Sequence, residues 1–189
     1  MRMRFMLMLC LFPLVAAAEP LDVDGGCLDC HRPTRVRLQA PIIEGQSPGY
    51  LVNQLRRFRE RHRDSFPMSA LVAGMSEADL QALAAELASR PWPAWRMRVD
   101  EAAVERGGIR VRQFACDACH GASFLGEGDL PRLAGQHPGY LRRQLDAFGE
   151  RHRHHPPSAT GAPLTRLGVR DRGDIAAFLH AAGAAGSGE

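Results

Sequence analysis

The sequence predicts an all-α protein that contains two tandem copies of one small helical unit. Residues 41–68 and 131–158 align at an offset of 90 residues, and they share the segments PGYL and ERHR. In both copies apolar residues recur at i, i+4 and i+7, the spacing of one helix face, at Leu51, Leu55 and Phe58 and at Leu141, Leu145 and Phe148. Because no stretch alternates apolar and polar residues as a strand would, we interpret the chain as a helical duplication.

Local signals indicate where helices begin and end. The turns SPGY and HPGY come just before the first periodic helix of each unit. A second helix is expected after Ser76, an N-cap that forms a variant capping box with Asp79. Its counterpart begins at Asp171 and ends at Gly183. The second unit also has room for an earlier helix over residues 100–115, which Gly107 and Gly108 are expected to interrupt.

The domain organisation follows from composition along the chain. Residues 1–18 carry two arginines, an apolar run and small residues before a cleavage site after Ala18, as secretory signals do. The protein is therefore expected in the periplasm, without a permanent membrane anchor once the signal is removed. We divide the chain into a signal peptide (1–18), a first domain (19–90), a linker (91–96), a second domain (97–183) and a flexible tail (184–189).

The charge balance argues against nucleic acid as a partner. The chain has 24 arginines and no lysine against 21 acidic residues, and the formal charge of +3 comes partly from Arg2 and Arg4 in the predicted signal. A nearly neutral mature chain lacks the basic surface that phosphate contacts require.

Two short motifs carry the chemistry, and they use every cysteine after the predicted signal: CLDCH (Cys27, Cys30, His31) and CDACH (Cys116, Cys119, His120). C-x-x-C-H is the attachment signature of haem c. Two thiols one helical turn apart reach the two vinyl groups on one edge of the porphyrin, and the adjacent imidazole lies beneath the iron as proximal ligand. We therefore expect two covalently attached haem c groups.

Other interpretations of the cysteine pairs are weaker. A four-cysteine zinc site needs pairs closer together than the 85 residues that separate these. A thioredoxin-like redox pair needs a strand–helix–strand context, which neither motif has. Disulfides would leave the two adjacent histidines unexplained.

With its two C-x-x-C-H units, each followed by a proline, a GQ pair and a tyrosine-bearing helix, the chain resembles the di-haem class I cytochromes c of the cytochrome c4 type. LAGQHPGYLRRQLDAF is the most specific segment. The resemblance implies two tandem cytochrome c domains, an exported electron carrier, and iron held by the motif histidine and a methionine before the last helix. It also implies that Pro41 and Pro131 lie near the proximal histidines, where their carbonyl groups can orient the imidazoles.

The sixth ligand of the first haem is expected to be Met68, eight residues before Ser76. Met75 is the alternative, but its place beside the helix cap explains it structurally. In the second unit Ser158 or Pro163 aligns with Met68, depending on the landmark, and neither is a good iron ligand.

The loop of the second unit contains two histidines that the first unit lacks, His154 and His155. A bis-histidine second haem using His155 or His154 is the first hypothesis. An open or water-ligated iron is the second, and another ligand such as His137 or His180 is the third, although those two positions look like ordinary polar ones. Because imidazole stabilises ferric iron more than a thioether does, the second haem is expected to have the lower potential.

These features favour an electron carrier between redox partners such as an oxidase, a reductase or a dehydrogenase. The alternative is a haem enzyme or ligand sensor that uses an open sixth position on the second haem. A subunit docked on a larger oxidase or dehydrogenase is a further hypothesis.

Overall fold

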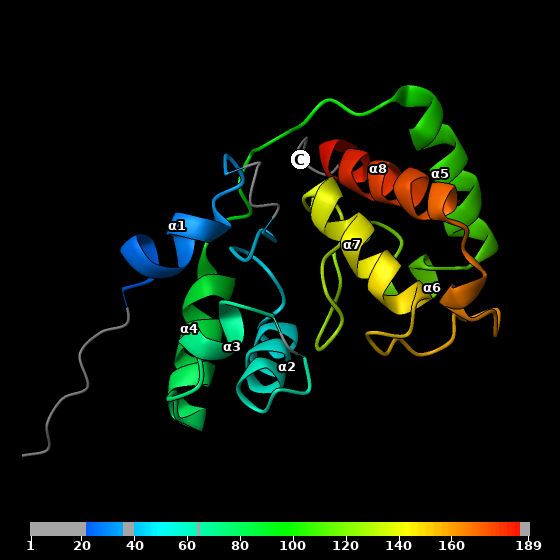
Figure 1. Ribbon diagram of the computed structural model, residues 1–189. Helices are drawn as coiled ribbons and strands as arrows, with labels where there is room; N and C mark the ends of the chain where they lie inside the picture. The colour runs from blue at the N-terminus through cyan, green and yellow to red at the C-terminus, as the bar shows by residue number, and fades with distance from the viewer. Residues whose placement is uncertain (1–21, 36–39, 64, 186–189) are drawn as a thin grey trace, which may run out of the picture.

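The computed structural model describes residues 22–35, 40–63 and 65–185, so the predicted signal peptide and residues 186–189 lie outside the described part. Over these ranges the chain is helical and contains no strand, which confirms the all-α class. Two helical units lie side by side, joined by an extended linker (Figure 1). Unit one contains the π-helical turn η1 (Val23–Cys27) and helices α1 (Leu28–His31), α2 (Pro48–Arg59), α3 (Met68–Leu71) and α4 (Glu77–Ser89). Unit two contains α5 (Glu101–Gln113), α6 (Asp117–His120), α7 (Pro138–Gly149), the 3-10 turn η2 (Leu164–Arg166) and α8 (Val169–Ala185).

Unit one is built on the packing of α2 against α4. The Ser47 hydroxyl accepts a hydrogen bond from the Tyr50 N–H at the start of α2, and Pro48 occupies the first turn. Ser76 and Asp79 form the predicted capping box at the start of α4. The expected apolar faces meet in one core, which buries Leu51, Leu55 and Phe58 of α2 and Leu80, Leu83, Ala84 and Leu87 of α4.

Unit two has an additional helix, α5, which packs along α8. Helix α5 runs without a break through Gly107 and Gly108, so the prediction that these glycines interrupt it was wrong. A Cβ atom at Gly107 would lie 2.0 Å from the backbone oxygen of Asp174, and one at Gly108 would lie 3.0 Å from the Phe178 ring. The glycines therefore allow α5 and α8 to approach closely, and this packing outweighs their weak helix propensity.

The linker is held on unit two by two histidines. The Trp95 ring stacks on His137 with 5.3 Å between ring centroids and meets His180 edge-on at 5.4 Å. The His180 Nδ1–H donates to the Gln136 carbonyl at 2.9 Å, and Nε2 accepts from the Met97 N–H at 3.0 Å. His137 and His180 are only 2% and 1% exposed. They are therefore core residues, and the interpretation of both as ordinary polar positions was wrong.

Helix α8 continues past its predicted end at Gly183 to Ala185. Gly183 lies instead where α8 contacts the turn before α7. A Cβ atom at this position would be only 2.4 Å from the Cα of Gly135. This glycine is thus explained by close packing and not by helix termination.

The two units meet through hydrogen bonds that cross in both directions, which we call the glutamine contacts. The Gln136 side chain of unit two binds the N–H and the C=O of Ile42 in unit one, at 2.7 and 2.8 Å. The Gln46 side chain of unit one binds the N–H and the C=O of Arg132 in unit two, at 2.7 and 3.0 Å. Because Gln46 and Gln136 are equivalent in the repeat, the contacts are related by a pseudo-twofold axis.

Gly107→Ala should lower the free energy of unfolding by about 1–3 kcal/mol, because the added methyl group meets the Asp174 backbone and forces α5 and α8 apart. Gly173→Ala on α8 is the matched control, since a Cβ atom there meets nothing within 4 Å. The control should be neutral or stabilising by about 0.5–1 kcal/mol. Thermal and chemical unfolding followed by circular dichroism would compare them, and equal stabilities would contradict the close-packing role.

Candidate haem sites

The first candidate site is formed where η1 meets α1. Cys27 is the last residue of η1, and Cys30 and His31 lie on α1. His31 is 8% exposed, and its Nδ1 lies 2.8 Å from the Pro41 carbonyl oxygen. Since a carbonyl can only accept, Nδ1 carries the proton and the Nε2 lone pair is left for a metal. Burial lowers the pKa of His31, which keeps the ring neutral at neutral pH.

The second candidate site repeats this arrangement on α6. Cys116 precedes the helix, Cys119 and His120 lie on it, and His120 Nδ1 is 3.1 Å from the Pro131 carbonyl oxygen. Burial again lowers the pKa of the histidine. The structure thus brings Pro41 and Pro131 to the motif histidines, as the resemblance implied.

The second site also contains His155. Its ring lies nearly parallel to that of His120, with 6.4 Å between the centroids and 28° between the planes. Phe148 of α7 supports the His155 ring edge-on at 4.9 Å. His155 Nδ1 is 2.6 Å from the Pro156 carbonyl oxygen, so its Nε2 lone pair is free as well.

The other candidate ligands of the second unit have other surroundings. His154 is exposed. The Ser158 hydroxyl is hydrogen-bonded to Thr160 at 2.8 Å, and Pro163 comes just before η2. His137 and His180 are enclosed with Trp95 in the linker contact described above. Of the two loop histidines, the structure therefore brings only His155 to the motif.

Met68 begins α3 and is half-buried against the core of unit one. Cys27 packs against the same core, so Met68 and Cys27 belong to one cluster. Met75 also contacts that core. Packing alone therefore does not separate the two methionines.

The cysteines support none of the other interpretations. Cys27, Cys30, Cys116 and Cys119 form no disulfide with one another. Within the described ranges no group of three or more His, Cys, Asp or Glu side chains could hold a metal ion. Burial raises the pKa of Cys27 and raises that of Cys116 to about 11.

Two arginines lie at the junction of the units, and their surroundings show whether the residues there fit a haem. Arg63 and Arg153 are partly buried, and the hydrogen-bond partners that the structure shows for them are neutral: Tyr50, Gln54, Tyr140 and Gln144, at 2.5–3.4 Å. Each guanidinium crosses to the other unit, and Arg153 Nε is buried without a partner. Cations removed from water require counter-charge. The propionate carboxylates of haem groups would supply it, so the residues present fit the cofactor.

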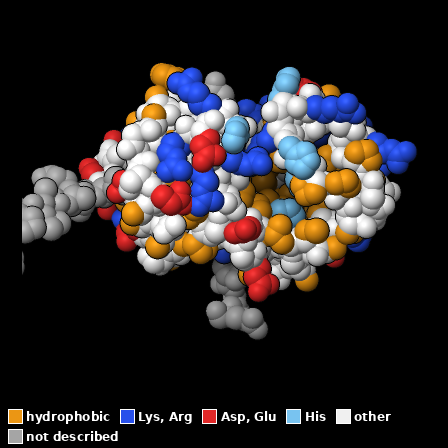
Figure 2. All heavy atoms as spheres, turned by 90° about the horizontal axis from the view of Figure 1, so that it is seen from below, with side chains coloured by type: hydrophobic (Ala, Val, Ile, Leu, Met, Phe, Trp, Pro, Cys, Tyr) orange, Lys and Arg blue, Asp and Glu red, His pale blue; other side chains and the backbone are white. Residues whose placement is uncertain are grey.

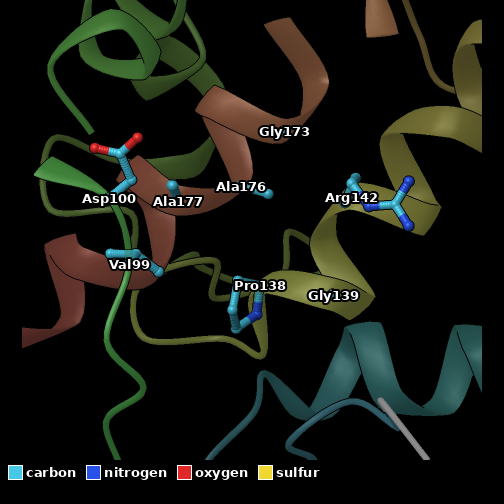
Figure 3. Close-up of a pocket in the computed structure, with 8 residues that line it drawn as sticks. All are labelled: Val99, Asp100, Pro138, Gly139, Arg142, Gly173, Ala176 and Ala177. Atoms are coloured by element: carbon cyan, nitrogen blue, oxygen red, sulfur yellow. The ribbon is translucent and has the colours of Figure 1, made fainter. Parts of the chain in front are cut away.

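The surface near this junction is hollowed. Figure 2 shows a hollow lined by hydrophobic side chains, with histidine side chains beside it. A separate cavity of about 260 Å³ lies between residues 99–100, α7 and α8 (Figure 3). Its charged residues are already engaged, since Asp100 caps α5 and Arg142 pairs with Asp146 at 3.1 Å. It contains no cysteine or histidine and takes no part in the candidate sites.

Comparison with known proteins agrees with this geometry. The cytochrome c family pattern matches residues 106–183. Cytochrome c4 of Thiocapsa roseopersicina is 30% identical over 174 residues, which are 86% of this chain and 90% of that protein. The thiosulfate dehydrogenase electron acceptor of Stutzerimonas stutzeri (strain A1501) is 31% identical over 144 residues, 70% of this chain and 67% of that protein. The solved structure of Acidithiobacillus ferrooxidans cytochrome c4 has a TM-score of 0.69 at 25% identity and covers 82% of this chain and 98% of that one.

Two helical units, each with a C-x-x-C-H motif whose histidine donates to a proline carbonyl, define a c-type cytochrome. The chain belongs to the cytochrome c4 family, and so it binds haem c covalently and takes part in electron transfer. No helix within the described ranges is both long enough and apolar enough to cross a lipid bilayer.

Sequence reasoning missed the roles of Arg63 and Arg153. The signal for them was present, because ERHR recurs in both copies and its last arginine is Arg63 in one and Arg153 in the other. Tyr50 and Tyr140 match in the same way. An arginine and a tyrosine that both recur in the two copies are the sequence signal for this junction.

Proposed function

We propose that this cytochrome carries electrons between redox partners in the periplasm through two covalent haems with unequal axial ligands. The first haem is attached to Cys27 and Cys30, with His31 and Met68 as iron ligands. The second is attached to Cys116 and Cys119, with His120 and His155 as iron ligands. The pairing of the His120 and His155 rings carries the proposal of unequal ligands.

The spacing of these rings fits two ligands on opposite faces of one metal ion. Bonds from a metal to imidazole nitrogen are about 2 Å long, so the centroids of two trans imidazoles lie about 6 Å apart. The 6.4 Å between His120 and His155 agrees with this value. Because both Nδ1 atoms are engaged by backbone carbonyls, both rings offer Nε2.

For the first haem, the proposal of Met68 rests on position and packing. Met68 lies on α3, between α2 and α4, and shares a core with Cys27. Met75 is less suitable because it directly precedes the capped start of α4, where Ser76 and Asp79 fix the backbone. The second unit has no methionine after Met97, so a thioether is available to the first unit alone.

Each bound haem supplies a one-electron ferric–ferrous couple. The residues of the chain set the reduction potential of each haem: a thioether in unit one would favour ferrous iron, and a second imidazole in unit two would favour ferric iron. Pro41 and Pro131 hold the motif histidines in one tautomer. Arg63 and Arg153 place positive charge between the units. Since the second haem would have the lower reduction potential, electron transfer from the second haem to the first should be favoured.

A ligand-binding or catalytic role for the second haem is the alternative function, and it requires an open iron position. His155 would occupy that position, held by Phe148 on one side and the Pro156 carbonyl on the other. The contacts therefore favour the carrier.

His155→Ala should convert the second haem from low spin to high spin and open it to carbon monoxide or cyanide, because the second imidazole is removed. His154→Ala is the matched control, because His154 is the exposed neighbour of His155 in the same loop, and this variant should retain the wild-type spectrum. Electron paramagnetic resonance and ligand titration would measure both, with mass spectrometry showing that two haems remain attached. A low-spin, closed second haem in His155→Ala would refute the proposed ligand.

Met68→Ala should remove the thioether–iron charge-transfer band in the near infrared and lower the potential of the first haem, because a soft ligand is lost. Met75→Leu should leave the band in place. Spectroelectrochemical titration of the wild type should show two one-electron steps, with the lower one belonging to the haem that lacks the band. Loss of the band in Met75→Leu alone would reverse the assignment.

We further propose that one electron donor is a thiosulfate-oxidising enzyme, because a 31% identical relative is named as the electron acceptor of a thiosulfate dehydrogenase. Mixing the oxidised protein with such an enzyme and thiosulfate should produce the reduced spectrum, and omitting either one should not. Reduction by a chemical reductant but not by the enzyme with thiosulfate would exclude this partner and leave the carrier role intact.

A further inference from the structure

Each proline carbonyl that receives a motif histidine belongs to a peptide group whose other end reaches the opposite unit. His31 Nδ1 donates to the Pro41 oxygen at 2.8 Å. The N–H of the same peptide group belongs to Ile42, and it donates to Gln136 Oε1 at 2.7 Å. One peptide group thus connects the histidine of unit one to a side chain of unit two.

The same chain of hydrogen bonds exists in the opposite direction. His120 Nδ1 donates to the Pro131 oxygen at 3.1 Å, and the Arg132 N–H donates to Gln46 Oε1 at 2.7 Å. The histidine of unit two is therefore connected to a side chain of unit one.

Further hydrogen bonds fix the orientation of the side-chain amides of Gln46 and Gln136. Gln136 Oε1 also accepts from the His137 N–H at 2.8 Å, and Gln46 Oε1 from the Ser47 N–H at 2.9 Å. Their amide nitrogens bind the Ile42 and Arg132 carbonyls. Gln46 and Gln136 are 3% and 2% exposed, so water does not compete for these bonds.

Buried hydrogen bonds in a chain polarise one another. When the glutamine oxygen accepts from the peptide N–H, electron density moves onto the carbonyl oxygen at the other end, and that oxygen becomes a stronger acceptor. A stronger bond to Nδ1–H increases the basicity of Nε2, and a more basic ligand stabilises ferric iron.

We propose that Gln46 and Gln136 are positioning residues that each adjust the iron-binding histidine of the opposite unit: Gln136 acts on His31, and Gln46 acts on His120. This inference rests on the proposed function, since it requires haem iron at both histidines. Each haem potential is then set partly by the unit that does not hold that haem.

The test measures both haem potentials in the full-length holoprotein. Gln136→Leu should lower the ferric-to-ferrous ratio of the first haem, measured at a fixed applied potential, about threefold. At 59 mV per decade, this change corresponds to a rise of roughly 28 mV in the reduction potential of that haem. The second haem should shift less. Gln46→Leu should give the reverse pattern, and the thioether–iron band identifies the first haem in each titration.

A control separates this effect from simple loosening of the interface. The Ser47 hydroxyl donates to the Gly128 carbonyl across the units. Ser47→Gly removes that bond, leaves both peptide groups intact and costs only a few tenths of a kcal/mol as an N-cap change. It should leave both potentials unchanged.

Where a leucine variant fails to assemble as holoprotein, Gln136→Asn and Gln46→Asn retain a buried amide one methylene shorter and should shift the same haems by less. The proposal is overturned by shifts in the haem of the mutated unit, by equal shifts of both haems, by no shift, or by equal shifts in Ser47→Gly. A wild type without a thioether–iron band or with fewer than two attached haems would instead overturn the proposed function.

Discussion

The hydrogen bond from a motif histidine to a proline carbonyl is the interaction on which the rest of the structure depends. Because the carbonyl can only accept, it fixes the proton on Nδ1 and leaves the Nε2 lone pair available to a metal. Proline suits this position because its fixed φ restricts the turn that presents the carbonyl. The segment between each motif and the following long helix serves to bring that oxygen within 2.8 Å of His31 and 3.1 Å of His120.

The duplication gives one chain the contact pattern of a twofold dimer. In such a dimer, residue i of the first copy contacts residue j of the second, and residue j of the first copy contacts residue i of the second. Arg63 reaches Tyr140, and Arg153 reaches Tyr50. Gln136 binds Ile42, and Gln46 binds Arg132. Among the described residues, the side chains that bind these two guanidinium groups are neutral, and anionic cofactor groups between the units would supply the counter-charge.

Much of the fold could be predicted because the responsible signals are local. The capping box of Ser76 and Asp79 needs no tertiary information, and neither does the spacing of Leu51, Leu55 and Phe58. The prediction that Gly107 and Gly108 break a helix failed because propensity describes an isolated helix, while the contact with Asp174 and Phe178 comes from another one. His180 was misjudged for the same reason, since its partners Trp95 and Met97 lie more than eighty residues away in the chain.

In the candidate sites too, features set by local sequence could be predicted, and features set by tertiary contacts could not. The C-x-x-C-H motifs are contiguous, and so their position in the chain was sufficient to find them. The choice between His154 and His155 depends on which of two adjacent side chains turns towards His120, and adjacency in a loop does not determine that. The glutamine contacts were invisible because each involves a backbone group 86 or 94 residues away.

The glutamine contacts have a consequence for the descent of such chains. Under the proposed role of Gln46 and Gln136, a substitution in either GQ pair would change the hydrogen bonding of the motif histidine in the other unit, so the two repeats would diverge under a shared constraint. A fragment separated at the linker would lose the glutamine of the other unit and expose the Ile42 or Arg132 peptide group to water.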